Sequence, residues 1–480
     1  MNTTSAGTAV PSAASPRPST STWLYALFRR IHFYAGILVA PFIFIAAATG
    51  ALYAVAPQAE KMIYSHVLTA PESTTRLSLD EQVAAANAHQ GSEKPLAVRP
   101  AVAPGTTTRI MYADESLPEF TYRAVFIDPA NGQVLGEYPV YGSSGSLPFR
   151  TWVSNLHKDL HLGEPGRIYS ELAASWLWVL ALGGLVLWVQ RARRMKNKRQ
   201  AILPSSKQRG YLRTLSRHSA LGFWAVLGML FLSATGLTWS TYAGENVSQV
   251  RKALSWTTPS VSKELQPGSS TATGGDHADH SSHTAETQTG SAVETVVSPS
   301  YDKILSTARG VNIDSVNLEI RPAADAETAW VVQETQRFYP TQVDAVAINP
   351  ATLEVTDRTD FKDYPLMAKL TRWGIDLHMG LHLGLINQIA LFVFALALMV
   401  MCAWGYLMWW QRRPKGERGF GPAPTRSSLR QVPLWAWALT AVFTVAVGIF
   451  VPLLGISLLV FILGDTLAHW VGRKKTRVEP

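Results

Sequence analysis

The sequence predicts an integral membrane α-helical protein in which a pseudo-twofold four-helix core carries two folded α+β domains. Three observations lead to this fold class: the composition, long stretches without charged residues, and an internal repeat. Of 480 residues, 47% are hydrophobic, only 16% are charged and 16 are Trp. The mean hydropathy of +0.07 is too low for a chain that lies wholly in a membrane. Polar domains must therefore alternate with apolar spans.

Four stretches free of Asp, Glu, Lys and Arg are long enough to cross ~30 Å of hydrocarbon as helices. They cover residues 32–56, 172–190, 218–242 and 383–410. A fifth span is predicted at 432–451. After Pro452 and Gly455, a shorter apolar segment that contains Asp465 and His469 ends near Trp470 and is expected to form a sixth. The sequence thus predicts a core of four spans and two extra C-terminal helices.

The charges of the connecting segments predict how the chain is oriented. Segments 1–31, 191–217, 411–431 and 471–480 hold 23 Lys and Arg against two acids, so they are expected in the cytoplasm. Segments 57–167 and 243–382 hold 20 Lys and Arg against 30 acids and are expected outside. The net charge of +9 is therefore a topology signal and indicates no nucleic acid partner. The pattern is typical of a multi-pass protein of a bacterial inner membrane with periplasmic domains.

An internal repeat divides the chain into two similar halves. FRTWVSNLHKDLHLG at 149–163 matches LTRWGIDLHMGLHLG at 370–384 with an offset of 221 residues. His32, Thr49 and Gly50 match His218, Thr235 and Gly236 with an offset of 186. The difference places an insertion in the second outer segment, where residues 266–292 are rich in Ser, Thr, Gly and His and are predicted not to fold.

These observations predict a definite order of segments. The first half begins with a disordered cytoplasmic tail (1–31), the first span (32–56) and the first outer domain (57–156), and ends with a histidine-bearing approach to the second span (157–190). After a basic loop (191–217), the second half consists of the third span (218–242), the second outer domain (243–377) and the fourth span with its approach (378–410). A basic loop (411–431), two further spans (432–470) and a cytoplasmic tail (471–480) complete the chain.

Each outer domain is expected to be a small α+β unit. In the first, Ser78 and Glu81 form a capping box that opens a helix reaching about His89, and strands at 123–127 and 133–138 flank an Asn131-Gly132 turn. In the second, a helix starts at Ser298-Pro299. The strands expected there cover 316–320, 329–334, 343–348 and 354–357.

Six histidines recur at equivalent positions in the two halves. His32 and His218 start the first and third spans, which run in the same direction, so their rings are expected at one depth on the cytoplasmic side. On the outer side the spacing predicts two His-x-x-x-His pairs, each on one helical face: His157 with His161, and His378 with His382. Ionisable residues within spans are rare and indicate function.

Two levels of facing histidines favour two bis-imidazole haems, because imidazole is a strong axial ligand for haem iron and apolar helices can wall the macrocycle. Type b is expected, since the chain has no Cys-x-x-Cys-His motif. A zinc or dimetal site is the alternative for the outer pairs, although neither contains the glutamate that zinc proteases require. Interfacial histidines bonded to lipid or backbone are a second alternative, but they do not explain a fixed offset.

Other features carry less information. His277, His280 and His283 lie in the polar insertion and could bind a transition metal weakly, while a solvated loop is the simpler reading. The lone cysteine, Cys402, lies inside a span and is expected to pack there. No dinucleotide or phosphate-binding motif is present, so any reductant is expected to come from quinol or a cytoplasmic reductase.

Several motifs resemble the PepSY-associated transmembrane family over nearly the whole chain: RIHFYAGILVAPFIFIAAATGALY, LHKDLHLGEPGR, RHSALGFWAVLGMLFLSATGLTW and DLHMGLHLGLINQ. The segments IDPANGQV and INPATLEV resemble PepSY domains. Members are often iron-regulated, and some are periplasmic ferric-siderophore reductases with two haems. The resemblance implies that His157 and His378 are the outer ligands and His32 and His218 the inner ones, with His161 and His382 as alternates.

Two functions from different classes are therefore expected. The first is a haem-containing inner-membrane electron-transfer protein that reduces a ferric complex, in particular a ferric siderophore, at its periplasmic face. The alternative is a non-catalytic PepSY membrane protein that binds a peptide, protease or envelope partner, or senses a metal. A metal transporter is disfavoured, because the four core spans contain no Asp or Glu to coordinate a moving cation.

Overall fold

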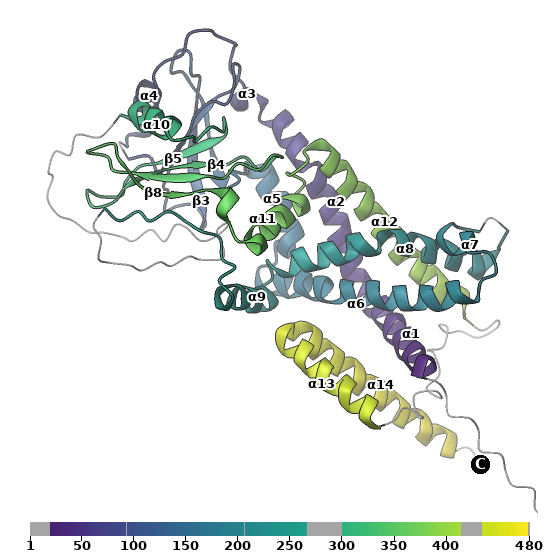
Figure 1. Ribbon diagram of the computed structural model, residues 1–480. Coiled ribbons are helices and arrows are strands. Elements are labelled where there is room, and N and C mark those ends of the chain that lie inside the picture. The colour runs from purple at the N-terminus through teal and green to yellow at the C-terminus, as the bar shows by residue number, and fades with distance from the viewer. Residues whose placement is uncertain (1–19, 93, 206, 266–299, 414–433, 479–480) are drawn as a thin grey trace, which may run out of the picture. The chain divides into compact units, whose positions relative to one another are not determined.

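Four long helices dominate the computed structural model, which describes residues 20–92, 94–205, 207–265, 300–413 and 434–478 (Figure 1). Within these residues, four helices have the length and apolar composition needed to cross a membrane. They are α2 (Ala40–Ile63), α6 (Glu164–Arg194), α8 (Gly210–Leu237) and α12 (Leu385–Gln411). The four core spans predicted from the sequence are therefore confirmed as membrane-capable helices.

The first span differs from the prediction at its start. Helix α1 (Thr20–Leu38) ends one residue before α2 begins at Ala40. Pro41 causes the break, because its nitrogen carries no hydrogen to donate to a carbonyl of the preceding turn. His32 consequently lies inside α1 and not at the start of the spanning helix.

The C-terminal residues form a helical hairpin. Helix α13 (Leu434–Phe450) and helix α14 (Pro452–Val478) are joined at Val451. The apolar parts of both are shorter than the four spanning helices. The two helices cross where Gly448 and Gly455 meet, and a Cβ on Gly455 would lie 2.6 Å from the Cα of Gly448. Glycine at both positions permits this close approach.

The chain forms two units. One takes its residues from 1–41, 176–229 and 401–480, and the other from 42–175 and 230–400. The first unit contains His32 and His218, and the second contains His157 and His378. Each predicted histidine pair therefore lies within one unit.

Four short elements connect the longer helices and the strands. They are α3 (Ser65–Leu68), α7 (Arg199–Ile202), α9 (Tyr242–Ala253) and the 3-10 turn η1 (Phe361–Asp363).

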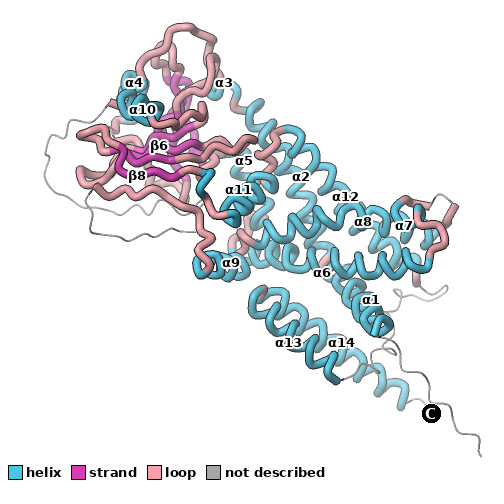
Figure 2. Tube along the Cα trace, in the orientation of Figure 1, coloured by secondary structure: helices cyan, strands magenta, loops and turns pink. Residues whose placement is uncertain are grey.

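An eight-stranded antiparallel sheet organises the second unit, with the order β4-β3-β2-β1-β5-β6-β7-β8 (Figure 2). Strands β1 (Ala97–Arg99), β2 (Thr108–Tyr112), β3 (Thr121–Ile127) and β4 (Val134–Tyr141) follow helix α4 (Leu79–Gln90). Strands β5 (Leu318–Arg321), β6 (Trp330–Glu334), β7 (Ala345–Ile348) and β8 (Val355–Thr359) follow helix α10 (Tyr301–Gly310). Each half thus repeats one helix and four strands.

The sequence predicts two separate outer domains, whereas the structure joins their strands into one sheet. Strand β1 pairs with β5 where Val98 lies opposite Ile320. The predicted hairpin is present: Gly132 has a φ of +75° and the register shifts at Phe126/Ile127. The turn that contains Gly132 needs a residue in the left-handed region, which glycine adopts without steric cost.

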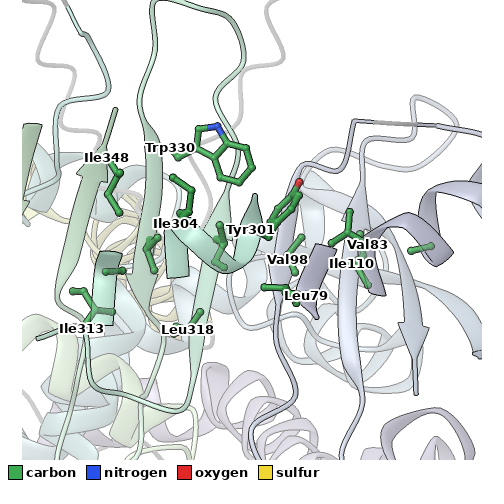
Figure 3. Packing of buried hydrophobic residues seen from close by; sticks show 14 of the residues in the cluster. Leu79, Val83, Val98, Ile110, Tyr301, Ile304, Ile313, Leu318, Trp330 and Ile348 are labelled. Atoms are coloured by element: carbon green, nitrogen blue, oxygen red, sulfur yellow. The ribbon is translucent and has the colours of Figure 1, made fainter. Parts of the chain in front are cut away.

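One hydrophobic core serves both halves. Helices α4 and α10 lie side by side over one face of the sheet and contact each other. Figure 3 shows Leu79 and Val83 from α4 and Ile304 from α10 packed over Val98 and other strand residues. Full burial of one such side chain contributes about 1.5–3 kcal/mol. The halves therefore stabilise each other directly.

The two core helices also cap each other. The Ser78 hydroxyl accepts a hydrogen bond from the Glu81 N–H, and the predicted capping box is complete. The Asp302 carboxylate of α10 accepts hydrogen bonds from the N–H groups of Leu79 and Asp80 at 3.0 and 3.1 Å. Asp80 in turn accepts the N–H of Tyr301 at 2.7 Å. These carboxylates occupy the electropositive helix N-termini, where anions are favoured.

The opposite face carries an ion-pair triad at the junction of the halves. Glu319 of β5 pairs with Arg99 of β1 at 2.6 Å and with Arg321 at 2.5 Å, and its side chain is 3% exposed. Burial alone would raise the pKa of Glu319, but the two arginines outweigh it and lower that pKa to about 2. A carboxylate with a lowered folded-state pKa stabilises the fold fully above its ordinary value of 4.5. This stabilisation is lost as the pH falls from there toward 2.

Replacing Glu319 by Gln is expected to destabilise the junction by about 3–5 kcal/mol, because two guanidinium groups then lack a carboxylate in a buried site. Hydrogen exchange on the full chain in detergent, followed by mass spectrometry, should become faster in peptides that contain β1 and β5. Glu137→Gln is the matched control, since Glu137 pairs with Arg123 but is 39% exposed and should cost under about 1 kcal/mol. Unchanged exchange in the Glu319 variant would contradict the assigned role of the triad.

Candidate functional site

Two short helices bring the outer histidines to the spanning helices. Helix α5 (Pro148–Asp159) follows β4, and helix α11 (Leu366–His378) follows β8. Proline suits the first position of α5, because its ring fixes φ and no helical partner is lost there. His157 lies in the last turn of α5, and His378 is the last residue of α11.

The expectation that each His-x-x-x-His pair shares one helical face is wrong. Helix α5 ends at Asp159, and Leu160 and His161 both have positive φ angles, 54° and 56°. Helix α11 ends at His378 and is followed by Gly380 with a φ of +73°. The chain reverses before the second histidine of each pair. The two imidazoles of a pair therefore point to different surroundings.

The first histidine of each pair bonds to a threonine on a spanning helix. His157 Nδ1 lies 3.0 Å from Thr49 Oγ1 of α2, and His378 Nδ1 lies 2.6 Å from Thr235 Oγ1 of α8. The next residue along each spanning helix is a glycine that leaves room for the ring. A Cβ on Gly50 would lie 3.2 Å from His157 Cε1, and one on Gly236 would lie 3.9 Å from His378 Cε1. Threonine and glycine together form the seat of each ring.

The threonine hydroxyls bear on which ring nitrogen carries the proton. Thr49 Oγ1 lies 2.9 Å from the carbonyl of Ile45, and Thr235 Oγ1 lies 2.8 Å from that of Phe231. A hydroxyl has one hydrogen, so a threonine that donates to its carbonyl can only accept from the imidazole Nδ1–H. We therefore expect both rings to be the neutral Nδ1–H tautomer. Their Nε2 atoms keep a lone pair, which is the state that binds a metal.

The second histidines have other contacts. His161 stacks on Trp152 with the ring centroids 5.1 Å apart. His382 is buried, its ring lies 5.9 Å from that of Tyr339, and its Nδ1 has no hydrogen-bond partner among the described residues. The two second histidines thus lie in unlike environments. Only the first histidines share the same hydrogen bond.

The other predicted pair comes together in the first unit. The rings of His32 in α1 and His218 in α8 have centroids 6.4 Å apart and an interplanar angle of 79°. Two small residues of α6 lie beside His32, where a Cβ on Gly184 would be 3.2 Å from its Cε1. The Nδ1 atoms of both rings are buried without a hydrogen-bond partner among the described residues. The backbone of Leu180 lies close enough to His32, and that of Met401 close enough to His218, to interact with the ring.

The pair of His32 and His218 fits a planar metal cofactor better than a bare metal ion. Two imidazoles on opposite sides of one metal, each through a bond of ~2 Å, have centroids roughly 6 Å apart, and the inner rings are separated by 6.4 Å. No three His, Cys, Asp or Glu side chains of the described residues gather into a metal site. A structural zinc site needs four ligands and a catalytic one needs three from the protein. A macrocycle that supplies its own four donors needs only two imidazoles.

Two other predicted features concern the polar insertion and the lone cysteine. His277, His280 and His283 lie outside the described residues. Cys402 lies in α12, is partly buried and forms no disulfide, as expected for a packing residue. The role of Thr49 and Thr235 was missed by sequence reasoning, although the signal was present. Both precede a glycine at the same offset as His32 and His218.

Comparison with known families agrees with these motifs. Residues 29–412 match the model of the PepSY-associated TM region. The chain belongs to this PepSY-associated transmembrane family. The resemblance seen in the sequence motifs is thereby confirmed, and the match includes all six repeated histidines. No curated protein matches the chain.

The assigned tautomer of this PepSY-associated protein can be tested directly. Nitrogen-15 NMR of the histidine-labelled chain in detergent, with His157 and His378 assigned by substitution, is expected to show Nδ1–H rings at neutral pH. Thr49→Val should shift the His157 signal alone, because valine has the shape of threonine but cannot accept a hydrogen bond. Thr49→Ser keeps the hydroxyl and serves as the control. An Nε2–H signal for His157 in the unmodified protein would refute the assignment.

Proposed function

We propose that this protein is a haem-containing electron carrier of the bacterial inner membrane that reduces a ferric complex, in particular a ferric siderophore, at its periplasmic face. The proposal includes a pseudo-twofold core of four spans, a cytoplasmic N-terminus and two periplasmic PepSY-like domains that share their sheet. It rests above all on one observation. His157 and His378 each form a hydrogen bond through Nδ1 with a threonine at the equivalent position of a spanning helix.

His157 and His378 would hold one b-type haem, and His32 and His218 a second. A haem iron between two imidazoles changes between its ferric and ferrous states without a change of ligands, and so supplies one-electron transfer. Thr49 and Thr235 keep their imidazoles neutral, with Nε2 free to coordinate. Gly50 and Gly184 leave space beside the His157 and His32 rings. Each residue thus has a defined role toward the cofactor.

The proposed reaction is the transfer of one electron to an iron(III) complex outside the membrane. Reduction to iron(II) weakens binding by hard oxygen donors, so the metal is released from the chelator. Quinol or a cytoplasmic reductase would supply the electron, since the sequence contains no dinucleotide-binding motif. The sheet unit offers the larger folded surface for a substrate. In this scheme the ferric complex is reduced on the side of the membrane where the sheet unit lies.

The purified protein is expected to bind about two b-type haems per chain, as measured by the pyridine haemochrome assay and the reduced-minus-oxidised spectrum. Ala at His32 or His218 should remove one haem, and Ala at His157 or His378 the other, because each cofactor needs both of its imidazoles. Thr49→Val should weaken retention of the outer haem about 10–100-fold. His161→Ala, with its ring stacked on Trp152, is the matched control.

Several outcomes of this experiment would count against the assignment. Loss of both haems in all four variants would indicate general unfolding. Loss of the outer haem in His161→Ala or His382→Ala, and not in the variants of their neighbours, would move the ligand to the second histidine of each pair. A colourless protein after expression with ample haem would reject the haem proposal.

Iron reduction is tested with dithionite-reduced protein in detergent, after excess dithionite has been removed. A ferric siderophore is expected to reoxidise it and to produce iron(II) that ferrozine can capture. His157→Ala and His378→Ala should abolish both signals, whereas His161→Ala should retain them. A different outcome is that the reduced protein stays reduced with every ferric chelate and yet is oxidised rapidly by an acceptor without iron. That result would reject iron reduction as the function but would still support an electron carrier.

A further inference from the structure

The loop Gly142–Ser146, which connects β4 to α5, is surrounded by arginines from both halves of the sheet unit. Four arginines donate to it: Arg99 to the Ser143 carbonyl at 2.7 Å, Arg109 to the Gly145 carbonyl at 2.8 Å, Arg150 to Ser146 Oγ at 2.9 Å and Arg337 to Ser143 Oγ at 2.7 Å. They come from β1, β2, α5 and the β6–β7 connection. We call this set the arginine loop site.

Carboxylates balance only part of this charge. Arg99 pairs with Glu319, Arg150 with Glu60 and Arg337 with Asp376. Arg109 has no carboxylate within ion-pair distance among the described residues, and its guanidinium lies over the Phe126 ring at 4.9 Å. Arg321 shares Glu319 with Arg99, and Arg372 shares Asp376 with Arg337. Among the four arginines that donate to the loop, Arg109 is thus the one without an ion pair to a described residue.

Arg109 is held in a surrounding that disfavours its charge. Burial and then repulsion by Arg99 lower the pKa of Arg109 to about 9. The residue as a whole is half-buried, while its guanidinium lies against the loop backbone at Gly145. A cation in such a place is costly without a counter-charge, and a bound anion would offset that cost.

The loop is shaped around the guanidinium groups. Gly145 has a φ of +59°, and a Cβ there would lie 2.4 Å from Arg109 Nη1 and 2.6 Å from Arg99 Nη1. Any other residue would push both cations away from the loop backbone. The hydrogen bonds of Arg109 and Arg99 described above use only some of the five N–H donors that each guanidinium carries, in a planar fork suited to a carboxylate.

The arginine loop site adjoins the end of α11 that bears His378. Arg337 Nη2 reaches Ser143, while its Nη1 lies 3.4 Å from Asp376 Oδ1 and 3.7 Å from Met379 Sδ. Asp376 and Met379 stand two residues before and one after His378. A group bound at the loop would thus lie next to the segment that positions the outer histidine.

From this arrangement we propose that the arginine loop site binds a carboxylate group, with Arg109 and Arg99 as its principal donors. The proposal rests on the proposed function only for the ligand's identity: the carboxylate would belong to an anionic ferric chelate that docks for reduction. A second source of the same chemistry is a haem propionate, which the experiment separates from the first. Neutral or cationic chelates would not be favoured by this site.

The test uses gallium(III) citrate, an anionic complex that cannot be reduced, and a cationic gallium(III) trihydroxamate as the comparison. Isothermal titration of the full chain in detergent should show binding of the citrate complex that weakens with salt. Arg109→Gln should raise its Kd about tenfold or more, through the loss of charged hydrogen bonds. Arg109→Lys should retain part of the affinity. Arg123→Gln, which removes an arginine from the same sheet that already pairs with Asp114, should bind as the unmodified protein does.

Ser143→Asp provides a variant that keeps all the arginines. Its carboxylate would occupy the site, so citrate binding should be lost while thermal stability is retained or increased. Equal citrate affinity in the unmodified protein, Arg109→Gln and Ser143→Asp overturns the proposal, whatever the haem content. If haem-loaded protein does not bind citrate and Arg109→Gln loses haem, the carboxylate is that of the cofactor and the substrate assignment falls. If a protein without haem binds citrate, the carboxylate-binding site is supported and the proposed function is rejected.

Discussion

The pairing of β1 with β5 is the interaction on which the rest of the sheet unit depends. It is short, with Val98 opposite Ile320, and the Glu319 triad lies on the adjacent face. Through it the two repeats bury one core beneath α4 and α10. The outermost strands, β4 and β8, lead into α5 and α11. The junction therefore fixes the two helices that carry His157 and His378, so a change at the centre of the sheet acts on both histidines.

The second constraint is the direction of two hydrogen bonds. A threonine inside a helix commonly donates to the carbonyl one turn earlier, which leaves its oxygen free to accept. Thr49 and Thr235 do this on α2 and α8, and the imidazole that approaches must then donate. The spanning helix thus sets the tautomer of a histidine that comes from a different helix. Duplication of the chain repeats this arrangement with the same geometry.

Sequence patterns gave the spans, the repeat and the local signals of the outer segments, because these depend on hydropathy and on neighbouring residues. The four spans, the capping box at Ser78 and the hairpin at Gly132 agree with the structure. The β1–β5 pairing could not be predicted, since a strand of three residues has no periodicity and its partner lies over 200 residues away. The His-x-x-x-His spacing wrongly predicted that both histidines of a pair share one helical face. Each helix ends inside the motif, where Leu160 and Gly380 have positive φ angles.

The candidate site could likewise be predicted only in part from the sequence. The recurrence of six histidines identified the residues, but spacing alone could not choose between His157 and His161 or between His378 and His382. The choice depends on which ring meets a threonine, and that is a tertiary contact. The arginine loop site could not be predicted from the sequence, because its arginines come from four elements of both repeats and no motif connects them.

The two histidine pairs also differ in the hydrogen bonds of their rings. At His157 and His378 the expected Nδ1–H donates to a threonine hydroxyl, and such a bond makes the opposite ring nitrogen more basic. At His32 and His218, no hydroxyl of the described residues bonds to either Nδ1 atom. His157 and His378 would therefore be the stronger donors toward any metal bound at Nε2, because only their basicity is raised by a spanning helix.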